Sequence, residues 1–356
     1  MIHGKFVEVE PVIRKFLPKG INFFYFCGGR GIGKTFSALD LCRKIGDGTV
    51  TFDPNEEQNK FMYLRRTAVE AESVASIEGN AFKKYNKEEG YEITPDFNNK
   101  LGFGNYYLDS ERKRHIGYIA GLSTFANLRG VDFSDVQFLF FDECIPENRH
   151  KAVIKREGIL LLNVMETINR NRELLGRPPI ILCMLSNAID LGSVLLSELA
   201  LTPILNNMIF KGQQRYTDKE RCLHIEKYKD HVVSQEKETT ALYKFAKPTG
   251  FNEEALSGDF LANDLTVIKK VNLQEYFPLL SLENLFVYQH KSEELFYIAQ
   301  IPATPKYEFR VYEREKFREV FYWKYKLMVI DRKVNYDNYQ TKVVFESMIN
   351  YKPLVS

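Results

Sequence analysis

Eight consecutive residues near the start of the chain have the types and spacing of a phosphate-binding loop. Gly28-Gly29-Arg30-Gly31-Ile32-Gly33-Lys34-Thr35 matches the pattern G-x-x-x-x-G-K-[ST]. Glycines let the backbone turn so that successive N–H groups point at phosphate oxygens, and a following helix adds partial positive charge. Lys34 would reach the β- and γ-phosphates, and the Thr35 hydroxyl would hold magnesium. The loop therefore predicts binding of a nucleoside triphosphate.

The segments on either side of this loop are the ones that the chemistry needs. Residues 22–27 before it are apolar and predict a buried strand, while residues 36–42 after it predict the first turns of an amphipathic helix. A chance match in a glycine-rich turn is the alternative. The strand and helix make that alternative the weaker one, because a phosphate loop must join a strand to a helix N-terminus.

A second motif supplies the acids that hydrolysis requires. The apolar run Phe138-Leu139-Phe140-Phe141 ends in Asp142-Glu143, which is the Walker B form. Asp142 would hold magnesium, usually through water, and Glu143 would polarise the attacking water as general base. Two acids at an exposed strand end are the alternative. Since GTPases usually lack this pair, it favours an ATPase of the additional-strand, catalytic-glutamate class, with ATP and Mg²⁺ as cofactors.

Three further polar residues are candidates for the same site. Asn187 follows the apolar run 180–185 and could orient the water and sense hydrolysis, although Ser-Asn is also a common turn sequence. Arg170 on an expected crossover helix and Arg129 before the Walker B strand are candidate transition-state stabilisers. An arginine supplied by a neighbouring subunit can raise turnover by about three to five orders of magnitude. For a lone arginine, a solvated surface charge is the usual alternative.

Composition sets the broad class. The chain has 356 residues and a net charge of +2, which is long enough for two or three domains and neither suggests nor excludes nucleic acid. Its five cysteines are odd in number and lack metal-knuckle or redox spacing, which fits a reducing compartment. The N-terminus has no apolar core of a signal peptide, and no apolar run approaches a membrane span. We expect a soluble cytoplasmic protein with no membrane contact.

The order of apolar and helical segments predicts the domains. Up to about Leu201, strands alternate with helical stretches such as 67–85 and 156–175, and residues 106–109 and 115–120 suggest a hairpin. This alternation predicts a doubly wound α/β domain with a mostly parallel sheet over residues 1–205. Residues 216–247 are polar and helical in composition, so 206–257 is expected to be a small helical linker. Residues 258–356 predict a small α+β domain.

An ordered set of motifs resembles the genome-packaging ATPases of small podophages, the Picovirinae type. The set comprises Gly28–Thr35, Tyr63-Leu64-Arg65-Arg66, Phe140-Phe141-Asp142-Glu143, Asn169-Arg170-Asn171-Arg172-Glu173 and Leu185-Ser186-Asn187-Ala188. The resemblance covers the first two hundred residues and implies nucleotide and magnesium binding by Lys34 and Thr35. It further implies that Asp142 holds magnesium, Glu143 is the base and Asn187 is a polar sensor.

The same resemblance implies which residues act between subunits. Arg170 corresponds to the trans-acting finger, and Arg129 matches a basic residue that also acts across the subunit interface, where the family has lysine. The family also implies a homo-oligomeric ring, expected to have five subunits, with ATP sites at the interfaces. The ring is implied to drive double-stranded DNA through a portal into a procapsid. The protein is then expected in the host cytoplasm and, transiently, at the portal vertex of the procapsid.

The C-terminal region is implied to have an RNase H-like fold without nuclease activity. A two-metal nuclease needs several carboxylates gathered at strand ends. The acids of this region are scattered outside convincing apolar strands, at Asp259, Asp264, Asp331 and Asp337. We therefore expect no nuclease metal site.

Basic residues on loops are candidates for gripping DNA without reading its bases. Arg112-Lys113-Arg114 at the hairpin turn and Lys83-Lys84 with Lys87 are two such groups. Basic and aromatic residues also interleave between Arg310 and Lys326. For residues 315–326, however, an amphipathic helix with its aromatic face in the core is the preferred interpretation, since glutamates dilute the charge.

The leading functional hypothesis is ATP-driven translocation of viral double-stranded DNA. Three alternatives stay open at this point. They are a P-loop kinase acting on a small molecule, a nucleotide-regulated adaptor, and a packaging enzyme with an active nuclease domain. The kinase would need an arginine-bearing lid and an acceptor pocket, and the sequence has no clear lid.

Overall fold

The computed structural model describes most of the chain as two compact units. The described residues are 5–55, 59–128, 130–146, 154–187, 191–229, 231–249, 252, 255–256, 267–310, 313–331 and 333–348. One unit comprises Met1–Ile189, Ser193–Leu199 and Met208–Phe260, and the other comprises Asp190–Gly192, Ala200–Asn207 and Leu261–Ser356. Each unit has its own sheet, and they are described separately.

A nine-stranded sheet forms the centre of the first unit, in the order β3-β4-β5-β2-β6-β7-β1-β9-β8. The strands are β1 (Phe23–Gly28), β2 (Lys60–Arg65), β3 (Thr94–Asn98), β4 (Phe103–Tyr107), β5 (His115–Gly121), β6 (Val136–Phe141), β7 (Ile181–Ser186), β8 (Arg215–Asp218) and β9 (Leu223–Tyr228). The six strands from β5 to β9 in this order run parallel, and β3, β4 and β8 pair antiparallel at the edges. The predicted α/β fold with a large, mostly parallel sheet is confirmed.

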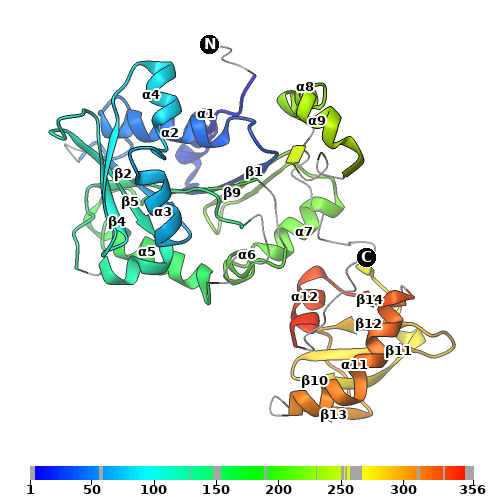
Figure 1. The fold of residues 1–356 in the computed structure, drawn as a ribbon. Coiled ribbons are helices and arrows are strands. Elements are labelled where there is room, and N and C mark those ends of the chain that lie inside the picture. The colour runs from blue at the N-terminus through cyan, green and yellow to red at the C-terminus, as the bar shows by residue number, and fades with distance from the viewer. Residues whose placement is uncertain are drawn as a thin grey trace. The chain divides into compact units, whose positions relative to one another are not determined.

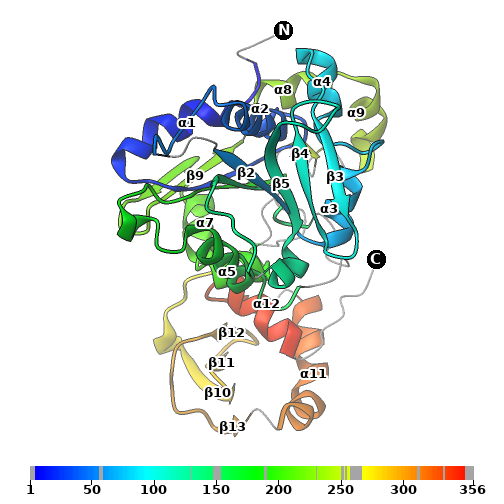
Figure 2. The same cartoon turned by 90° about the vertical axis from the view of Figure 1, so that its left-hand side faces the viewer.

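Helices cover both faces of this sheet, as the two views in Figure 1 and Figure 2 show. The helices of this unit are α1 (Val9–Phe16), α2 (Lys34–Gly46), α3 (Ala68–Ala75), α4 (Lys83–Glu89), α5 (Glu157–Asn169), α6 (Val194–Glu198), α8 (Val232–Glu238) and α9 (Ala241–Ala246). Helix α7 (Thr202–Phe210) is divided between the two units, with residues up to Asn207 in the second. Short 3₁₀ turns are η1 (Leu17–Lys19), η2 (Leu122–Leu128), η3 (Glu173–Leu175) and η4 (Lys247–Thr249). All six residues of β6 are buried, which is the pattern of a central strand covered on both sides.

Local interruptions divide two of the expected helices. The stretch 67–85 is not one helix, because α3 ends at Ala75 and α4 begins at Lys83. Thr67 starts α3 with a capping box, in which its side chain and that of Glu70 each accept a backbone N–H of the other. The crossover stretch likewise ends its α-helix at Asn169, and a 3₁₀ turn follows at Glu173–Leu175.

The expectation of helix over residues 216–228 is wrong, because these residues lie in the edge strand β8, in β9 beside it, and in the turn that joins them. The register pairs Phe24 with His224, so β9 continues the parallel sheet beside the phosphate-loop strand. His224 is buried and its ring stacks on Phe16 at 3.8 Å between centroids. Pairing with β1 and this burial outweigh the polar composition, because strand formation depends on the surroundings of a segment more than on its intrinsic propensity. Residues 232–246 do form the helices α8 and α9.

A five-stranded sheet in the order β13-β10-β11-β12-β14 forms the second unit. Its elements are η6 (Leu273–Glu275), β10 (Tyr276–Leu282), β11 (Leu285–His290), β12 (Phe296–Ala299), β13 (Tyr307–Phe309), α11 (Arg314–Ile330), β14 (Val334–Tyr336) and α12 (Tyr339–Met348). Strands β10, β11 and β12 form an antiparallel meander, while β13 and β14 run parallel to β10 and β12.

Helix α11 has the amphipathic arrangement preferred from the sequence. Its aromatic residues Phe317, Phe321 and Tyr325 are buried one turn apart, whereas Trp323 is 66% exposed on another face. Asp259 and Asp264 lie outside the described residues. In the part of the chain that the structure describes, no three His, Cys, Asp or Glu side chains gather as a metal-binding group. Within the same ranges, no helix is both long and apolar enough to cross a bilayer.

Candidate functional site

The phosphate-binding loop joins β1 to α2 at the carboxyl edge of the parallel sheet. Strand β1 ends at Gly28 and α2 begins at Lys34, so the loop leads directly into a helix N-terminus. Gly31 and Gly33 have φ angles of +71° and +101°. Only glycine adopts these angles without strain, and a Cβ at Gly33 would lie 2.7 Å from the Cβ of Phe6. The turn that aims the loop N–H groups thus depends on these two glycines.

Lys34 is held over the loop by carbonyl oxygens. Its side chain is buried, and its Nζ donates to the carbonyls of Gly28 at 2.8 Å and Gly29 at 2.9 Å. Nζ also lies 3.3 Å from Oδ1 of Asn187, the first residue after β7. The ammonium group is therefore positioned where loop, strand β7 and a bound phosphate would meet. The predicted sensor Asn187 lies beside the predicted phosphate-binding lysine.

Thr35 and Asp142 lie together as a magnesium site requires. Thr35 Oγ1 donates to Oδ1 of the buried Asp142 at 3.1 Å, and the Tyr63 hydroxyl donates to Oδ2 at 3.0 Å. Neighbouring oxygen ligands of octahedral Mg²⁺ lie roughly 3 Å apart, so the Thr35 and Asp142 oxygens fit one coordination sphere. Burial raises the pKa of the Asp142 carboxyl above its usual value, although the nearby Arg65 opposes the shift.

Glu143 projects from a strained backbone position into an ion pair. Its φ angle is +47°, and its side chain is 45% exposed. Arg65 Nη2 lies 2.6 Å from Glu143 Oε2, while Arg65 Nη1 lies 3.4 Å from Asp142 Oδ2. Strands β2 and β6 are neighbours with Leu64 opposite Phe141, so Arg65 meets the acids that end β6. One buried arginine thus holds both Walker B carboxylates.

Sequence reasoning gave Arg65 no role, although a signal was present. Strand β2 ends in Tyr-Leu-Arg with Arg66 directly after it, and Asp142-Glu143 directly follows its neighbour β6. Basic and acidic residues that follow adjacent parallel strands meet at one edge of the sheet. The second arginine, Arg66, pairs with Glu157 at 2.6 Å and links the same edge to the start of α5.

Arg170 lies at the opposite edge of the sheet from the phosphate-binding loop. It follows α5, and its Nη2 donates to the carbonyl of Val131, upstream of the start of β6. A strand of this length spans about 17–20 Å, so Arg170 is remote from the Lys34 of its own chain. Its backbone has φ +42°, and the side chain is exposed. Arg129 lies outside the described residues.

The basic hairpin turn makes internal contacts. Arg112 pairs with Asp96 at 3.0 Å, Lys113 pairs with Glu111, and Arg114 donates to the carbonyl of Asp47. Lys84 on α4 lies 3.7 Å from Glu88 and also covers the ring of Phe36. These contacts offset part of the positive charge of both groups that the sequence suggested for gripping DNA.

Comparisons with known proteins converge on one family. The family model described as "Podovirus DNA encapsidation protein (Gp16)" matches residues 13–339. The DNA packaging protein of Bacillus phage phi29 is 25% identical over 287 residues, covering 79% of this chain and 76% of that protein. The structure described as the bacteriophage Phi-29 viral genome packaging motor assembly aligns with a TM-score of 0.62 at 17% identity, covering 98% and 99% of the two chains. The Phi-28 gp11 DNA packaging motor aligns with a TM-score of 0.56 at 17% identity, covering 96% and 98%.

Proposed function

This chain belongs to the podovirus DNA encapsidation protein (Gp16) family and is a viral DNA packaging protein, and from that premise we propose that it is the motor's ATPase. In this proposal the protein hydrolyses ATP with Mg²⁺ and translocates double-stranded DNA through a portal into a procapsid. Copies of the chain form a ring, expected to be pentameric, with one nucleotide site at each subunit interface.

The separation of the two halves of the site carries this proposal. Lys34, Thr35, Asp142 and Glu143 meet at the carboxyl edge of the sheet, whereas Arg170 lies beyond the opposite edge. The Arg170 of one chain therefore cannot reach that chain's own nucleotide site. A ring brings each arginine to the site of the next subunit, which makes hydrolysis depend on the neighbour.

The strand order supports the additional-strand, catalytic-glutamate class. Strand β7 lies between the phosphate-loop strand β1 and the Walker B strand β6, so one strand is inserted between the two motifs. Asn187 at the end of this inserted strand reaches Lys34. In the proposed reaction, Glu143 accepts a proton from the attacking water while Lys34 and Asn187 orient the phosphate end. Thr35 and Asp142 would hold Mg²⁺, which would neutralise charge on the phosphates.

The C-terminal unit is proposed to be RNase H-like and without nuclease activity. Its antiparallel meander of β10, β11 and β12, with β13 parallel to β10, supports the fold assignment. As part of the same proposal, residues 1–205 are the ATPase domain and 258–356 the C-terminal domain, while strands β8 and β9 of the stretch 206–257 complete the sheet of the first unit. The protein is placed in the host cytoplasm and, during packaging, at the portal vertex of the procapsid.

Stimulation by DNA tests the proposed function. Double-stranded DNA is expected to increase ATP hydrolysis by the purified full chain, because DNA engagement organises the ring. Added salt is expected to reduce the stimulation, since contacts to phosphates release counterions. The measurement is steady-state phosphate release with and without duplex DNA, at two salt concentrations. Lys34→Ala is the control, and it is expected to abolish hydrolysis under both conditions.

Other outcomes of the same assay would identify the alternatives. Stimulation by a small-molecule phosphate acceptor, with no response to duplex DNA, would identify a kinase and contradict the motor. ATP binding without turnover under any condition would indicate an adaptor. Cleavage of the added DNA by the full chain with Mn²⁺ would indicate an active nuclease and overturn that part of the proposal.

Replacing Arg65 is expected to weaken the control of hydrolysis. Since Arg65 Nη2 holds the Glu143 carboxylate at 2.6 Å, Arg65→Gln should let the base reach water in the absence of DNA. DNA-independent turnover is then expected to rise several-fold, and the ratio of stimulated to unstimulated rates should fall. Both rates are measured at saturating Mg²⁺, because Arg65 also neighbours Asp142. Arg65→Lys is the matched control, and an unchanged ratio in Arg65→Gln would show that the ion pair has no regulatory role.

A further inference from the structure

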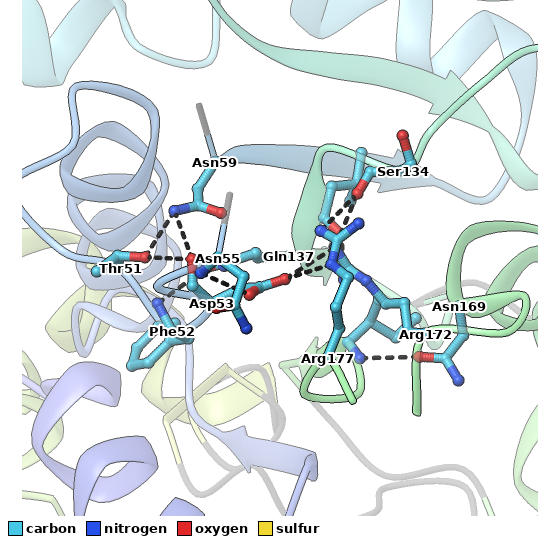
Figure 3. A network of polar contacts seen from close by, with 12 residues as sticks. Thr51, Phe52, Asp53, Asn55, Asn59, Ser134, Gln137, Asn169, Arg172 and Arg177 are labelled. Carbon is cyan, nitrogen blue, oxygen red and sulfur yellow. Dashed lines mark hydrogen bonds and ion pairs between the residues drawn. The ribbon is translucent and has the colours of Figure 1, made fainter. Parts of the chain in front are cut away.

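A buried ion cluster lies at the edge of the sheet that carries Arg170. Asp53 is fully buried, and its Oδ2 lies 2.8 Å from Arg177 Nε and 3.7 Å from Arg172 Nη2. The Arg172 side chain is 4% exposed. Figure 3 shows these side chains pointing toward one another from the loop around Asp53 and from the segment after α5. A buried carboxylate with two guanidinium groups is costly unless its geometry is well satisfied, so this cluster requires an explanation.

The two arginines of the cluster also hold the starting end of β6. Arg172 Nη1 donates to the carbonyl of Val136 at 2.7 Å, and its Nη2 donates to the carbonyl of Ser134 at 2.8 Å. Arg177 Nη2 donates to the Ser134 carbonyl as well, at 3.1 Å. Removing the negative charge of Asp53 would leave two guanidinium groups to share these carbonyls without their carboxylate. The cluster thus fixes the segment after α5 against the rim of the sheet.

Arg170 lies between two residues, Asn169 and Arg172, whose side chains anchor this segment to the sheet. Three positions before Arg172, the side-chain oxygen of Asn169 accepts a hydrogen bond from the backbone N–H of Ile180 at 3.0 Å, just ahead of β7. Arg172 is bound to the start of β6 on the other side. Between them Arg170 has φ +42°, a backbone conformation that is strained outside glycine and persists only where the surroundings impose it. The anchors fix the backbone of Arg170, whose exposed side chain donates to the carbonyls of Thr167 and Val131.

We propose that Asp53, Arg172 and Arg177 form the positioning site of the Arg170 finger. They touch neither the nucleotide nor the reacting water of their own subunit. They act through Arg170, by holding the backbone from which this side chain reaches the neighbouring subunit. The inference rests on the proposed function, because it requires that Arg170 acts in trans. It assigns a role to Arg172 of the Asn-Arg-Asn-Arg-Glu motif and to an aspartate that no motif contains.

A mixture of two variant subunits tests the positioning role. An acceptor subunit carries Arg170→Ala and keeps an intact hydrolysis site, while a donor subunit carries Glu143→Gln and keeps its finger. Equal amounts are mixed with duplex DNA and ATP, and the rescued hydrolysis is measured as kcat and KM. Asp53→Asn is then placed either in the donor or in the acceptor, whose own finger is already absent.

The expected result is a loss that depends on the placement. Asp53→Asn in the donor should lower the rescued kcat about 10- to 100-fold with KM for ATP unchanged, because a misplaced catalytic group costs rate. In the acceptor, the same substitution should change the rescued rate by no more than about twofold, because the acceptor has no Arg170 to position. This placement also shows whether the Asp53→Asn chain folds. Arg177→Gln, which removes the less buried arginine, should show the same dependence on placement.

Glu157→Gln serves as the matched control for a buried carboxylate. Glu157 pairs with Arg66 at 2.6 Å and lies at the other end of α5 from Arg170, so it should cause no donor-specific loss. Equal losses of rescue in both placements of Asp53→Asn, or no loss in the donor, would overturn the positioning role. If the two parent subunits fail to rescue each other, Arg170 does not act in trans. The proposed function then fails on this point, and the inference fails with it.

Discussion

Glu143→Gln is expected to bind ATP with nearly unchanged affinity and to lose hydrolysis by about 10²- to 10⁴-fold. The amide has almost the size of the carboxylate but cannot accept the proton of the attacking water. Lys34 and Thr35 are untouched, so the phosphate-binding contacts remain. Nucleotide affinity is measured by equilibrium binding of a fluorescent ATP analogue, and turnover is measured by phosphate release on duplex DNA.

Asp142→Asn provides the contrast that separates base from metal ligand. Asp142 lies 3.1 Å from Thr35 Oγ1, so its loss should raise the Mg²⁺ concentration needed for half-maximal turnover. Glu143→Gln should leave that concentration unchanged. A Glu143→Gln chain that still hydrolyses ATP at the normal rate would exclude Glu143 as the base. One that cannot hydrolyse ATP but still packages DNA would favour the nucleotide-regulated adaptor.

The position of the nucleotide-binding residues could be predicted from the sequence because these residues follow central parallel strands. A continuous apolar run predicts a central parallel strand, and such strands end at a common edge. Gly28, Asp142 and Asn187 each end or follow a run of this type, so their proximity follows from topology alone. The distances from Lys34 to Asn187 and from Thr35 to Asp142 agree with that expectation.

Residues whose roles depend on side-chain pairing could not be placed in this way. Arg65 ends a predicted strand, but nothing in its own segment indicates that β2 lies directly beside β6. Asp53 stands in a loop without any pattern, and it acquires Arg172 and Arg177 as partners only through folding. The polar strand β9, which lies between β1 and the edge strand β8, was missed for a related reason. Its burial comes from β1 and α1, which lie about 200 residues away in sequence, and no local signal encodes a neighbour at that separation.

The position of Arg170 also explains why a subunit should be inactive alone. Each chain holds its nucleotide site and its Arg170 on opposite edges of one rigid sheet, and a strand cannot shorten to bring them together. Under the proposed trans action of Arg170, turnover would report on the contact between neighbours as well as on the chemistry within one site. Variants that leave the fold intact but disturb this contact should lower kcat and leave ATP binding unchanged.

Arg170→Ala is expected to reduce DNA-stimulated turnover of a homogeneous ring by about 10³- to 10⁵-fold, the value of a trans-acting arginine. The exposed side chain contributes little to folding, so the variant should assemble and bind ATP normally. In rings that mix variant and wild-type subunits, packaging is expected to fall faster than the fraction of wild-type chains, because one missing finger stops the next site. The matched control is Arg14→Ala, at a half-exposed arginine that pairs with Glu10 on α1. Mixing Arg14→Ala subunits with wild-type subunits should leave packaging unchanged. Packaging is measured as protection of DNA from added nuclease across a series of mixing ratios. A strictly proportional decline would mean that each subunit works independently, and Arg170 would then have no role at a neighbouring site.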